Sequence, residues 1–195
     1  MGTPLVETDG RRLRSQDSRA RIVAAMLALT REGATSPSAE QVASRAGVGL
    51  RTVFRHFSDM ESLYREMHDA IEAELRAAAA QPFRGRTWRE RMLELIQRRS
   101  AGFEAIAPFR RAADLRRPGS PLLQAAHAEL AEALREILVR IAPEDIRRDA
   151  ARFEALDLLL SYEAWARLRN DQGLTPAQAR EALALTVTAL VGPED

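Results

Sequence analysis

The chain lacks several of the residues on which whole classes of functional site depend. It contains no cysteine, which excludes disulfide bonds, thiolate metal sites and cysteine nucleophiles. Its histidines are His56, His68 and His127, and neither of the last two has a glutamate three residues earlier, as a di-iron bundle requires. We therefore expect no metal and no cofactor.

Long apolar runs are also missing. No run approaches the roughly 20 residues that span a bilayer, and residues 1–17 lack the apolar segment of a signal peptide. The composition, 46% hydrophobic and 29% charged, is ordinary for a globular protein. These features predict a cytoplasmic protein with no membrane partner.

Catalytic motifs are absent as well. The sequence contains no phosphate-binding loop of the Walker type, no G-x-G-x-x-G, no H-E-x-x-H and no G-x-S-x-G. Isolated carboxylates such as Glu94, Glu104 and Glu129 are more typical of solvated helix surfaces than of catalytic sites. We therefore expect the protein not to be an enzyme.

The charges are balanced overall but unevenly distributed. The formal net charge is +1, and every basic side chain is an arginine because the sequence has no lysine. Residues 1–65 carry ten arginines against seven acidic residues, whereas residues 66–195 carry nineteen against twenty-one. A mildly basic front on a mildly acidic remainder favours a DNA-reading domain attached to a body with another role.

The stretch over residues 38–64 predicts two short helices, a tight turn and the start of a third helix. Ser38 and Gln41 have the spacing of a capping box. Gly47 can adopt the positive φ that ends the first helix, and a second helix is expected over residues 50–57. Two helices joined by a short glycine turn form a helix-turn-helix, whose second helix enters the DNA major groove.

This pattern alone leaves DNA binding open, because helical bundles also contain short helices joined by glycine. The chemistry of the outward face favours DNA, since residues 47–58 include no acid and the face carries only hydrogen-bond donors. These donors are Arg51, Thr52, Arg55 and His56. Such a face suits phosphates and base edges, whereas a face meant for water usually mixes charges of both signs.

The run over residues 46–64, AGVGLRTVFRHFSDMESLY, resembles the TetR family of transcriptional regulators. The matching positions are Ala46, Gly47, Val48, Thr52, Val53, Phe54, His56, Phe57, Asp59, Glu61 and Leu63. Gly49, Phe54 and Met60 stand where the family more often has Ser, Tyr and Lys, and Arg51 stands where it has Gly. The resemblance implies the same docking on DNA with a redistributed set of backbone contacts.

The outward face and the resemblance together place ten residues at the DNA. They are Ser38, Arg45, Gly49, Leu50, Arg51, Thr52, Phe54, Arg55, His56 and Met60. Rotation of the second helix about its axis decides which of them read bases and which meet phosphates, and this choice is open from the sequence.

The flanking segments complete a DNA-binding domain expected over residues 18–58. Apolar residues at helical spacing predict its first helix over residues 18–32. Residues 1–17, with three arginines between positions 11 and 14, are expected to form a flexible basic arm that can order on DNA. Ser58, or Asp59 as the rival cap, opens a long helix towards residue 80.

Residues 59–195 are expected to form a helical ligand-binding and dimerisation domain. The predicted helices span residues 59–80, 87–107, 122–141, 146–170 and 175–190, with a short helix between Pro108 and Arg117. No strand pattern and no repeat occurs. The expected fold class is therefore all-α, with about nine helices in total.

The resemblance implies that this body forms a homodimer through its last two long helices and encloses a pocket for a small-molecule effector of unknown identity. The expected dimer contacts are Phe153, Leu156, Leu160, Leu183, Val187 and Leu190. The expected pocket residues are Trp88, Phe103, Phe109, His127, Tyr162 and Trp165. An ordinary helical core would also explain each of these residues.

The predicted function is that of a ligand-responsive transcriptional regulator. A homodimer would place two copies of residues 50–57 in successive major grooves of a near-palindromic operator in double-stranded DNA. Repression is expected because the family that the sequence resembles consists mostly of repressors. The alternative is an all-α homodimeric interaction protein without specific DNA binding.

Overall fold

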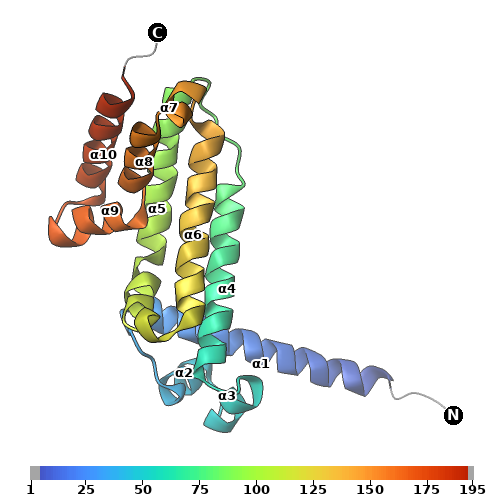
Figure 1. Ribbon diagram of the computed structural model, residues 1–195. Coiled ribbons are helices and arrows are strands. Elements are labelled where there is room, and N and C mark those ends of the chain that lie inside the picture. Colours follow the sequence, from blue (N-terminus) through green and yellow to red (C-terminus); the bar gives the residue numbers. More distant parts are fainter. Residues whose placement is uncertain (1–4, 193–195) are drawn as a thin grey trace. The chain divides into compact units, whose positions relative to one another are not determined.

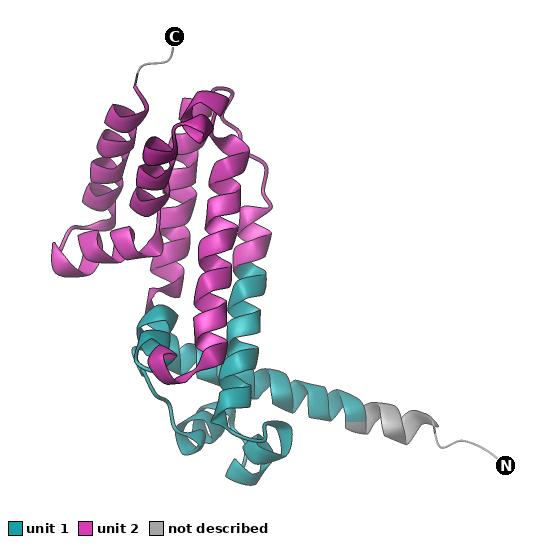
Figure 2. Ribbon diagram, viewed as in Figure 1, with its two compact units in different colours: residues 1–74, 108–116 teal, residues 75–107, 117–195 magenta. Residues whose placement is uncertain are grey.

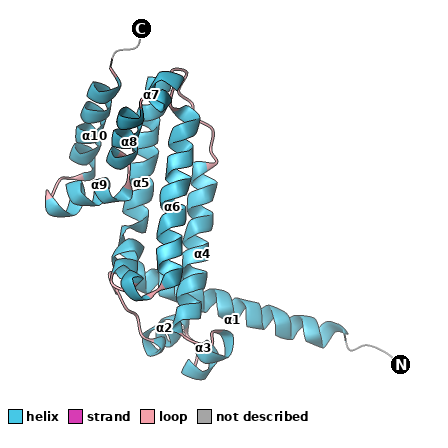
Figure 3. Cartoon of the chain, in the orientation of Figure 1, coloured by secondary structure: helices cyan, strands magenta, loops and turns pink. Residues whose placement is uncertain are grey.

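The structure, a computed structural model, describes the backbone of residues 5–192 and the side chains of residues 12–192. This part of the chain contains no strand (Figure 1, Figure 3). Its α-helices are α1 (Leu5–Arg31), α2 (Ala39–Ala46), α3 (Leu50–His56), α4 (Met60–Ala79), α5 (Trp88–Asp114), α6 (Pro121–Ile141), α7 (Glu144–Arg148), α8 (Ala150–Leu159), α9 (Tyr162–Ala166) and α10 (Pro176–Val191). A 3-10 turn, η1 (Arg117–Gly119), and a π-helical turn, η2 (Arg167–Asp171), complete them. The all-α class is confirmed, with one α-helix more than predicted.

The helices group into two compact units, which Figure 2 colours separately. Unit 1 comprises residues 1–74 and 108–116, and unit 2 comprises residues 75–107 and 117–195. The boundaries fall inside α4 and α5, so each of these helices belongs partly to both units. Within residues 5–192, no helix combines the length and the apolar character needed to cross a membrane.

Unit 1 is built around an apolar core to which α1 to α5 all contribute. Its most deeply buried members are Ile22, Met26, Val42, Val53, Phe57 and Leu63. Thr30 of α1 is also buried, and its hydroxyl donates to the Met26 carbonyl at 3.0 Å, so that this polar group is satisfied. The middle and end of α1 thus form the support on which α2 and α3 pack.

The first helix differs from the sequence prediction. α1 begins at Leu5 rather than Ser18, so residues 5–17 are helical and not an irregular arm. Residues 12–17 are all exposed, and such a stretch has no apolar face for periodicity to detect. Once the buried part of α1 has formed, each further residue adds a backbone hydrogen bond at low cost. The predicted arm over residues 1–4 lies outside the described residues.

The start of α4 shows which of the two rival caps is used. The Asp59 carboxylate accepts from the Ser62 backbone N at 2.7 Å, and the Ser62 hydroxyl donates to the Asp59 carbonyl at 2.7 Å. The Ser58 hydroxyl lies 3.2 Å from the same carboxylate. Asp59 is therefore the cap, and its hydrogen bond from Ser62 lowers the pKa of its carboxyl group.

α5 runs without interruption from Trp88 to Asp114 and contains Pro108 in its interior. The prediction that Pro108 ends this helix is wrong. A proline inside a helix removes one backbone hydrogen bond, and here it lies where α5 passes from unit 2 to unit 1. Ile106 and Phe109, on either side of it, are both buried. Packing on both sides therefore maintains the helix through the proline.

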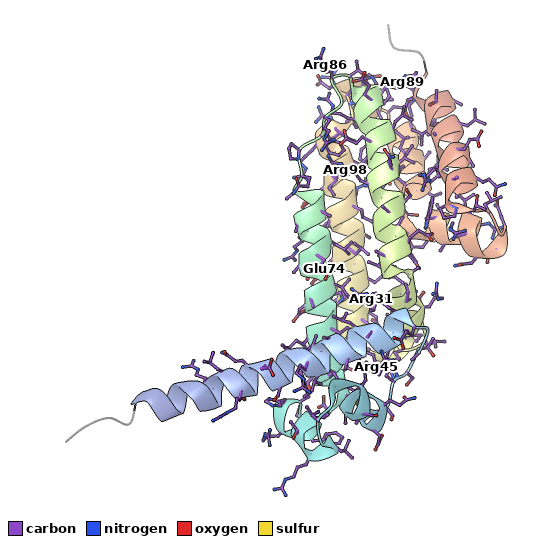
Figure 4. All side chains as sticks on the ribbon, turned by 180° about the vertical axis from the view of Figure 1, so that it is seen from behind. Arg31, Arg45, Glu74, Arg86, Arg89 and Arg98 are labelled. Carbon is purple, nitrogen blue, oxygen red and sulfur yellow. The ribbon has the colours of Figure 1, made fainter. Side chains whose placement is uncertain are left out.

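The break predicted at residues 81–86 is present, and α5 holds it in place. Glu94 accepts hydrogen bonds from the backbone N of Arg84 at 2.8 Å and of Gly85 at 3.2 Å. Arg98, labelled in Figure 4, donates to two carbonyls of this loop. A Cβ on Gly85 would lie 2.7 Å from a backbone N of α5, so only glycine permits this close approach.

The single helix predicted over residues 146–170 is wrong, because the structure divides it into α7, α8, α9 and η2. Asp149 caps α8 by accepting from the Arg152 backbone N at 3.1 Å. Ser161 caps α9 by accepting from the Ala164 backbone N at 3.1 Å. Both are favourable N-cap residues, and each accepts a hydrogen bond from one of the backbone N–H groups that a helix start leaves unpaired.

A buried arginine supports the break between α8 and α9. Arg99 of α5 is 6% exposed and donates from Nη1 to the Leu160 carbonyl at 2.7 Å. It also donates from Nη2 to the Leu134 carbonyl of α6. Burial lowers the pKa of Arg99 to about 10, so the guanidinium is still charged at neutral pH. One side chain thus joins α5 to α6 and to the end of α8.

Candidate nucleic-acid interface

The predicted helix-turn-helix is formed by α2, α3 and the turn between them. The Ser38 hydroxyl accepts from the Gln41 N at 3.3 Å, and the Gln41 side chain accepts from the Ser38 N at 2.8 Å. This is the capping box expected at the start of α2. At its end, Gly47 adopts φ +63°, and the Val48 N donates to the Ala43 carbonyl at 3.0 Å. The left-handed glycine ends α2 at once and lets the chain turn into α3.

α3 presents one continuous exposed face. Its exposed residues are Leu50, Arg51, Phe54 and Arg55. At 3.6 residues per turn these four positions share one side of the helix, while Val53 is buried on the other. The face therefore combines two arginines with two large apolar side chains, and no acid lies beside them in α3.

Arg45, one of the expected DNA contacts, is engaged within unit 1. Its Nη1 donates to Glu32 Oε1 at 2.7 Å, and its Nη2 contacts the other carboxylate oxygen. This two-point pair lowers the pKa of the Glu32 carboxyl group. Arg45 (labelled in Figure 4) is exposed, so it reaches a phosphate only by exchanging one anionic partner for another.

Four other residues expected to contact DNA have few side-chain groups free to do so. The Ser38 hydroxyl is used in the cap of α2. Gly49, the residue before α3, has no side chain and contributes only its backbone. Thr52 is half-buried, and Met60 packs partly buried against the core of unit 1.

His56, expected as a donor to DNA, is turned partly inward. Its Nε2 is buried and makes no hydrogen bond to the described residues. Burial and the positive charges of Arg55 and Arg19 lower its pKa. The ring is therefore uncharged at neutral pH and does not act as a cation towards a phosphate.

Arg19 of α1 holds the end of α3, a role that the sequence pattern did not predict. Its Nη1 donates to the His56 carbonyl at 2.8 Å, and its Nε donates to Glu66 of α4 at 2.9 Å. The guanidinium also lies over the Phe57 ring, 4.5 Å from the centroid. Arg19 lies one turn before the buried Ile22. This spacing places Arg19 on the same face of α1 as Ile22, and it is the one signal in the sequence that could have indicated the role of Arg19.

Arg21 supports the turn between α2 and α3 in a similar way. Its Nη2 donates to the Gly47 carbonyl at 3.2 Å and also contacts the Ala46 carbonyl. A Cβ on Gly47 would lie 2.9 Å from this nitrogen, which is a second reason for glycine at the turn. Two arginines of α1 therefore fix the helix-turn-helix from behind, and those of α3 are left to face outward.

The sequence of this motif matches a known family. A family model described as bacterial regulatory proteins, tetR family, matches residues 22–67, which include α2, the turn and α3. Residues 22–67 therefore form a DNA-binding domain of the tetR type. A chain that carries this domain is a DNA-binding transcriptional regulator.

Solved structures share the fold of this chain. A tetR-family transcriptional regulator from Streptomyces coelicolor superposes with a TM-score of 0.70 at 20% identity, over 90% of this chain and 80% of that chain. A transcriptional regulator from Rhodococcus sp. Rha1 gives a TM-score of 0.61 at 19% identity, over 89% and 95%. At these identities the likeness shows the fold alone. No curated protein matches the sequence.

Three of the residues expected at an effector pocket of the regulator lie between α5 and α9 in unit 2. Phe103 and Tyr162 meet edge to face, with ring centroids 5.6 Å apart. Trp165 is 2% exposed, and its Nε1 donates to Glu104 at 2.8 Å. The structure thus brings the aromatic rings of two helices together in a buried cluster.

The other three expected pocket residues lie at other points of the chain. Trp88 is half-buried at the start of α5. His127 of α6 has its Nδ1 2.8 Å from Arg117 Nη1. Phe109 belongs to the core of unit 1, where the guanidinium of Arg31 lies 5.6 Å from its ring centroid.

The residues expected at the dimer interface are mostly core residues of the single chain. Those buried within it are Phe153, Leu156, Leu160, Leu183 and Val187. Leu190 is half-buried. Because α8 and α10 are in contact, these side chains contribute to packing within the single chain. A second copy can cover only what this packing leaves exposed.

Proposed function

We propose that this TetR-family regulator is a repressor that binds a near-palindromic operator as a homodimer and is released by a small molecule. The observation that carries the proposal is the exposed face of α3, where Arg51 and Arg55 lie in a stretch, residues 47–58, without an acid. Two copies related by a two-fold axis present this face twice, as a near-palindrome requires. Repression is proposed because it is the usual role in this family.

The dimer face is proposed on the exposed sides of α8 and α10. Leu158 is 67% exposed and Leu185 is 73% exposed, although most large apolar residues of these helices are buried. An isologous contact that covers both leucines removes apolar surface from water. This choice replaces the buried residues expected from the sequence with their exposed neighbours on the same helices.

Replacing Leu185 by Ala is expected to raise the dimer dissociation constant about 30-fold, because two partly covered leucines lose about 2 kcal/mol between them. Sedimentation equilibrium measures this constant. The matched control is Leu93→Ala, which truncates another leucine, 44% exposed on α5. Equal dissociation constants for the two variants would place the dimer face elsewhere.

The effector is proposed to act at the aromatic cluster of Phe103, Tyr162 and Trp165. Two of these rings lie on α9, directly after the break that ends α8. A ligand that prefers one arrangement of α9 shifts the population towards it, and linkage then changes DNA affinity. α5 provides a covalent route for the coupling, since it carries Phe103 in unit 2 and Phe109 in the core of unit 1.

The first turns of α1 are proposed to add contacts to the DNA backbone. Arg12 and Arg14 are exposed, as is every residue from 12 to 17. A helix that extends beyond its packed part can place these guanidinium groups against phosphates without disturbing the core of unit 1.

The test is a titration of the purified protein against fragments of its own upstream DNA at about 50 and 200 mM salt. We expect one fragment to bind selectively and less tightly at the higher salt, with two protected half-sites. Arg12→Ala with Arg14→Ala should lower the salt slope by about 0.9 for each phosphate that the variant no longer neutralises. If no fragment is selected even after refolding to remove bound ligand, the proposal fails.

A further inference from the structure

The outward face of α3 limits which bases it can read. Its exposed residues are Leu50, Arg51, Phe54 and Arg55. α3 as a whole contains no Asn, Gln, Asp or Glu. In the major groove, adenine is recognised best by a side-chain amide, and the amino group of cytosine by a carboxylate. α3 therefore has neither of the groups that these two bases require.

The neighbouring helix does not supply the missing amide. Residues 39–57 contain a single amide side chain, that of Gln41 on α2, and its oxygen accepts a hydrogen bond from the Ser38 N at 2.8 Å. The first helix of a helix-turn-helix crosses the DNA backbone, whereas the second one carries the residues that meet base edges. Direct reading therefore depends on the four exposed residues of α3.

Arg51 and Arg55 suit guanine. The guanidinium group matches the O6 and N7 acceptors of guanine, which is the commonest specific contact in the major groove. The two arginines are one turn apart on the same face of α3, and both are exposed. Arg19 and Arg21, in contrast, donate to the His56 and Gly47 carbonyls behind the motif.

Leu50 and Phe54 suit thymine. Leu50 is 38% exposed and Phe54 is 48% exposed, also one turn apart on this face. The C5-methyl group of thymine is the apolar feature that the major groove offers, and side chains such as Phe contact it. Contact with this methyl group removes from water an apolar surface that the free protein leaves exposed.

We propose that α3 selects guanines through Arg51 and Arg55 and thymine methyl groups through Leu50 and Phe54. Each half-site is then recognised by a donor contact to G·C pairs and an apolar contact to A·T pairs. The inference rests on the proposed docking of α3 in the major groove, and it adds the bases that this docking selects.

The test uses an operator selected from random double-stranded DNA by the wild-type protein and then synthesised in three forms. One form is natural, one has deoxyuridine for thymine in the half-sites, and one has 7-deazaguanine for guanine. Deoxyuridine keeps the base pairing and loses only the methyl group, so we expect about fourfold weaker binding per contacted methyl. 7-Deazaguanine loses the N7 acceptor, so we expect at least about fivefold weaker binding per half-site.

Variants assign each effect to its side chain. Phe54→Ala should reduce the penalty for deoxyuridine to the part that Leu50 still contributes, whereas the control Leu93→Ala should keep the wild-type ratio. Arg55→Ala should reduce the penalty for 7-deazaguanine to the part that Arg51 still contributes, whereas replacing Arg147, an exposed arginine on α7, by Ala should leave the penalty unchanged. All four side chains are exposed, so unchanged circular dichroism should accompany each result.

The possible outcomes separate this inference from the docking on which it rests. Selective binding that is indifferent to deoxyuridine overturns the thymine contact, and indifference to 7-deazaguanine overturns the guanine contact, while α3 remains the reading helix. A wild-type protein that selects no sequence from random DNA overturns both the inference and the docking. Weaker binding to both analogues, with each effect reduced by its own variant and not by the control, supports the proposal.

Discussion

Replacing Arg51 and Arg55 together by Ala is expected to lower the affinity of the regulator for its operator about 1000-fold or more. Each well-placed arginine that reads a base contributes roughly 1–3 kcal/mol of discrimination. In a homodimer the change removes two such arginines from each protomer. Even at the lower figure the total is ~4 kcal/mol, which is three orders of magnitude in Kd. Fluorescence anisotropy with a labelled operator measures this effect at fixed salt.

The salt dependence of the double variant shows what the two arginines contact. If they read guanine, affinity for the operator falls far more than affinity for unrelated DNA, and the salt slope changes little. If they bind phosphates, both affinities fall together, and the slope decreases by about 0.9 for each phosphate left without its arginine. Measuring both DNAs at several salt concentrations distinguishes the two cases.

The control for this double variant removes the same charge from another part of the chain. Arg140 of α6 and Arg147 of α7 are both exposed, so Arg140→Ala with Arg147→Ala changes the net charge by the same amount. This control should bind the operator within about threefold of the wild type, because long-range charge effects on an exposed surface are screened. An unchanged Kd for the Arg51 and Arg55 variant would remove α3 from the interface.

The helix-turn-helix could be predicted because local chemistry determines it. Ser38 and Gln41 satisfy each other's backbone N–H groups within one turn. Gly47 meets the need for a positive φ by itself. Neither effect depends on residues far away in the sequence, so the ends of α2 and the start of α3 follow from the sequence alone.

The roles of single residues on this motif could not be predicted in the same way. Arg45 and His56 look like free donors in the sequence, but Glu32 of α1 pairs with Arg45, and burial turns His56 inward. The partners come from another helix, and helical spacing within α2 and α3 contains no information about them. The role of Arg19 was not predicted for the same reason, since it acts on α3 from α1.

The body of the chain shows where apolar periodicity fails. In the sequence, the apolar spacing of Phe153 and Leu156 fits a core position as well as a dimer contact. Only the packing of α8 shows that both are buried within one chain. The break at Leu160 and Ser161 was hidden because apolar residues continue across it. The buried charge of Arg99 was not predicted either, although Arg99 lies one turn after the buried Ile96 on the same face of α5.

Replacing Arg99 by Met is expected to lower the free energy of unfolding of unit 2 by roughly 3 kcal/mol. Methionine has a similar length but no donor. The carbonyls of Leu160 and Leu134 therefore lose their charge-assisted hydrogen bonds. Such bonds contribute roughly 1.5–3 kcal/mol each, and an unpaired buried carbonyl costs about 1–3 kcal/mol more.

The loss of these hydrogen bonds is partly offset in Arg99→Met, because the variant no longer buries a charge. Burial lowers the pKa of Arg99 well below its usual range, to about 10, which corresponds to about 3 kcal/mol that methionine would regain. Two charge-assisted bonds and one carbonyl left unpaired at the helix break together exceed this gain. The net effect is therefore a loss of stability.

Urea unfolding followed by tryptophan fluorescence measures this loss in the right part of the chain. Trp88 and Trp165 are the two tryptophans, and both lie in unit 2. A loss of roughly 3 kcal/mol should lower the fluorescence midpoint by about 2 M urea. Circular dichroism at 222 nm follows both units, so a transition of unit 1 should keep its midpoint where the two are resolved. Arg140→Met, an exposed change on α6, is the control.

The sign of the Arg99→Met effect decides why a charge is buried beside the break between α8 and α9. If the variant is more stable than the wild type, desolvation outweighs the two carbonyl bonds, and the fold retains Arg99 at a cost in stability. If it is less stable, the guanidinium holds α9 in its place after Leu160. Arg99→Lys then distinguishes charge from geometry: one ammonium group lacks the fork that reaches two carbonyls on different helices, so this variant should also be destabilised.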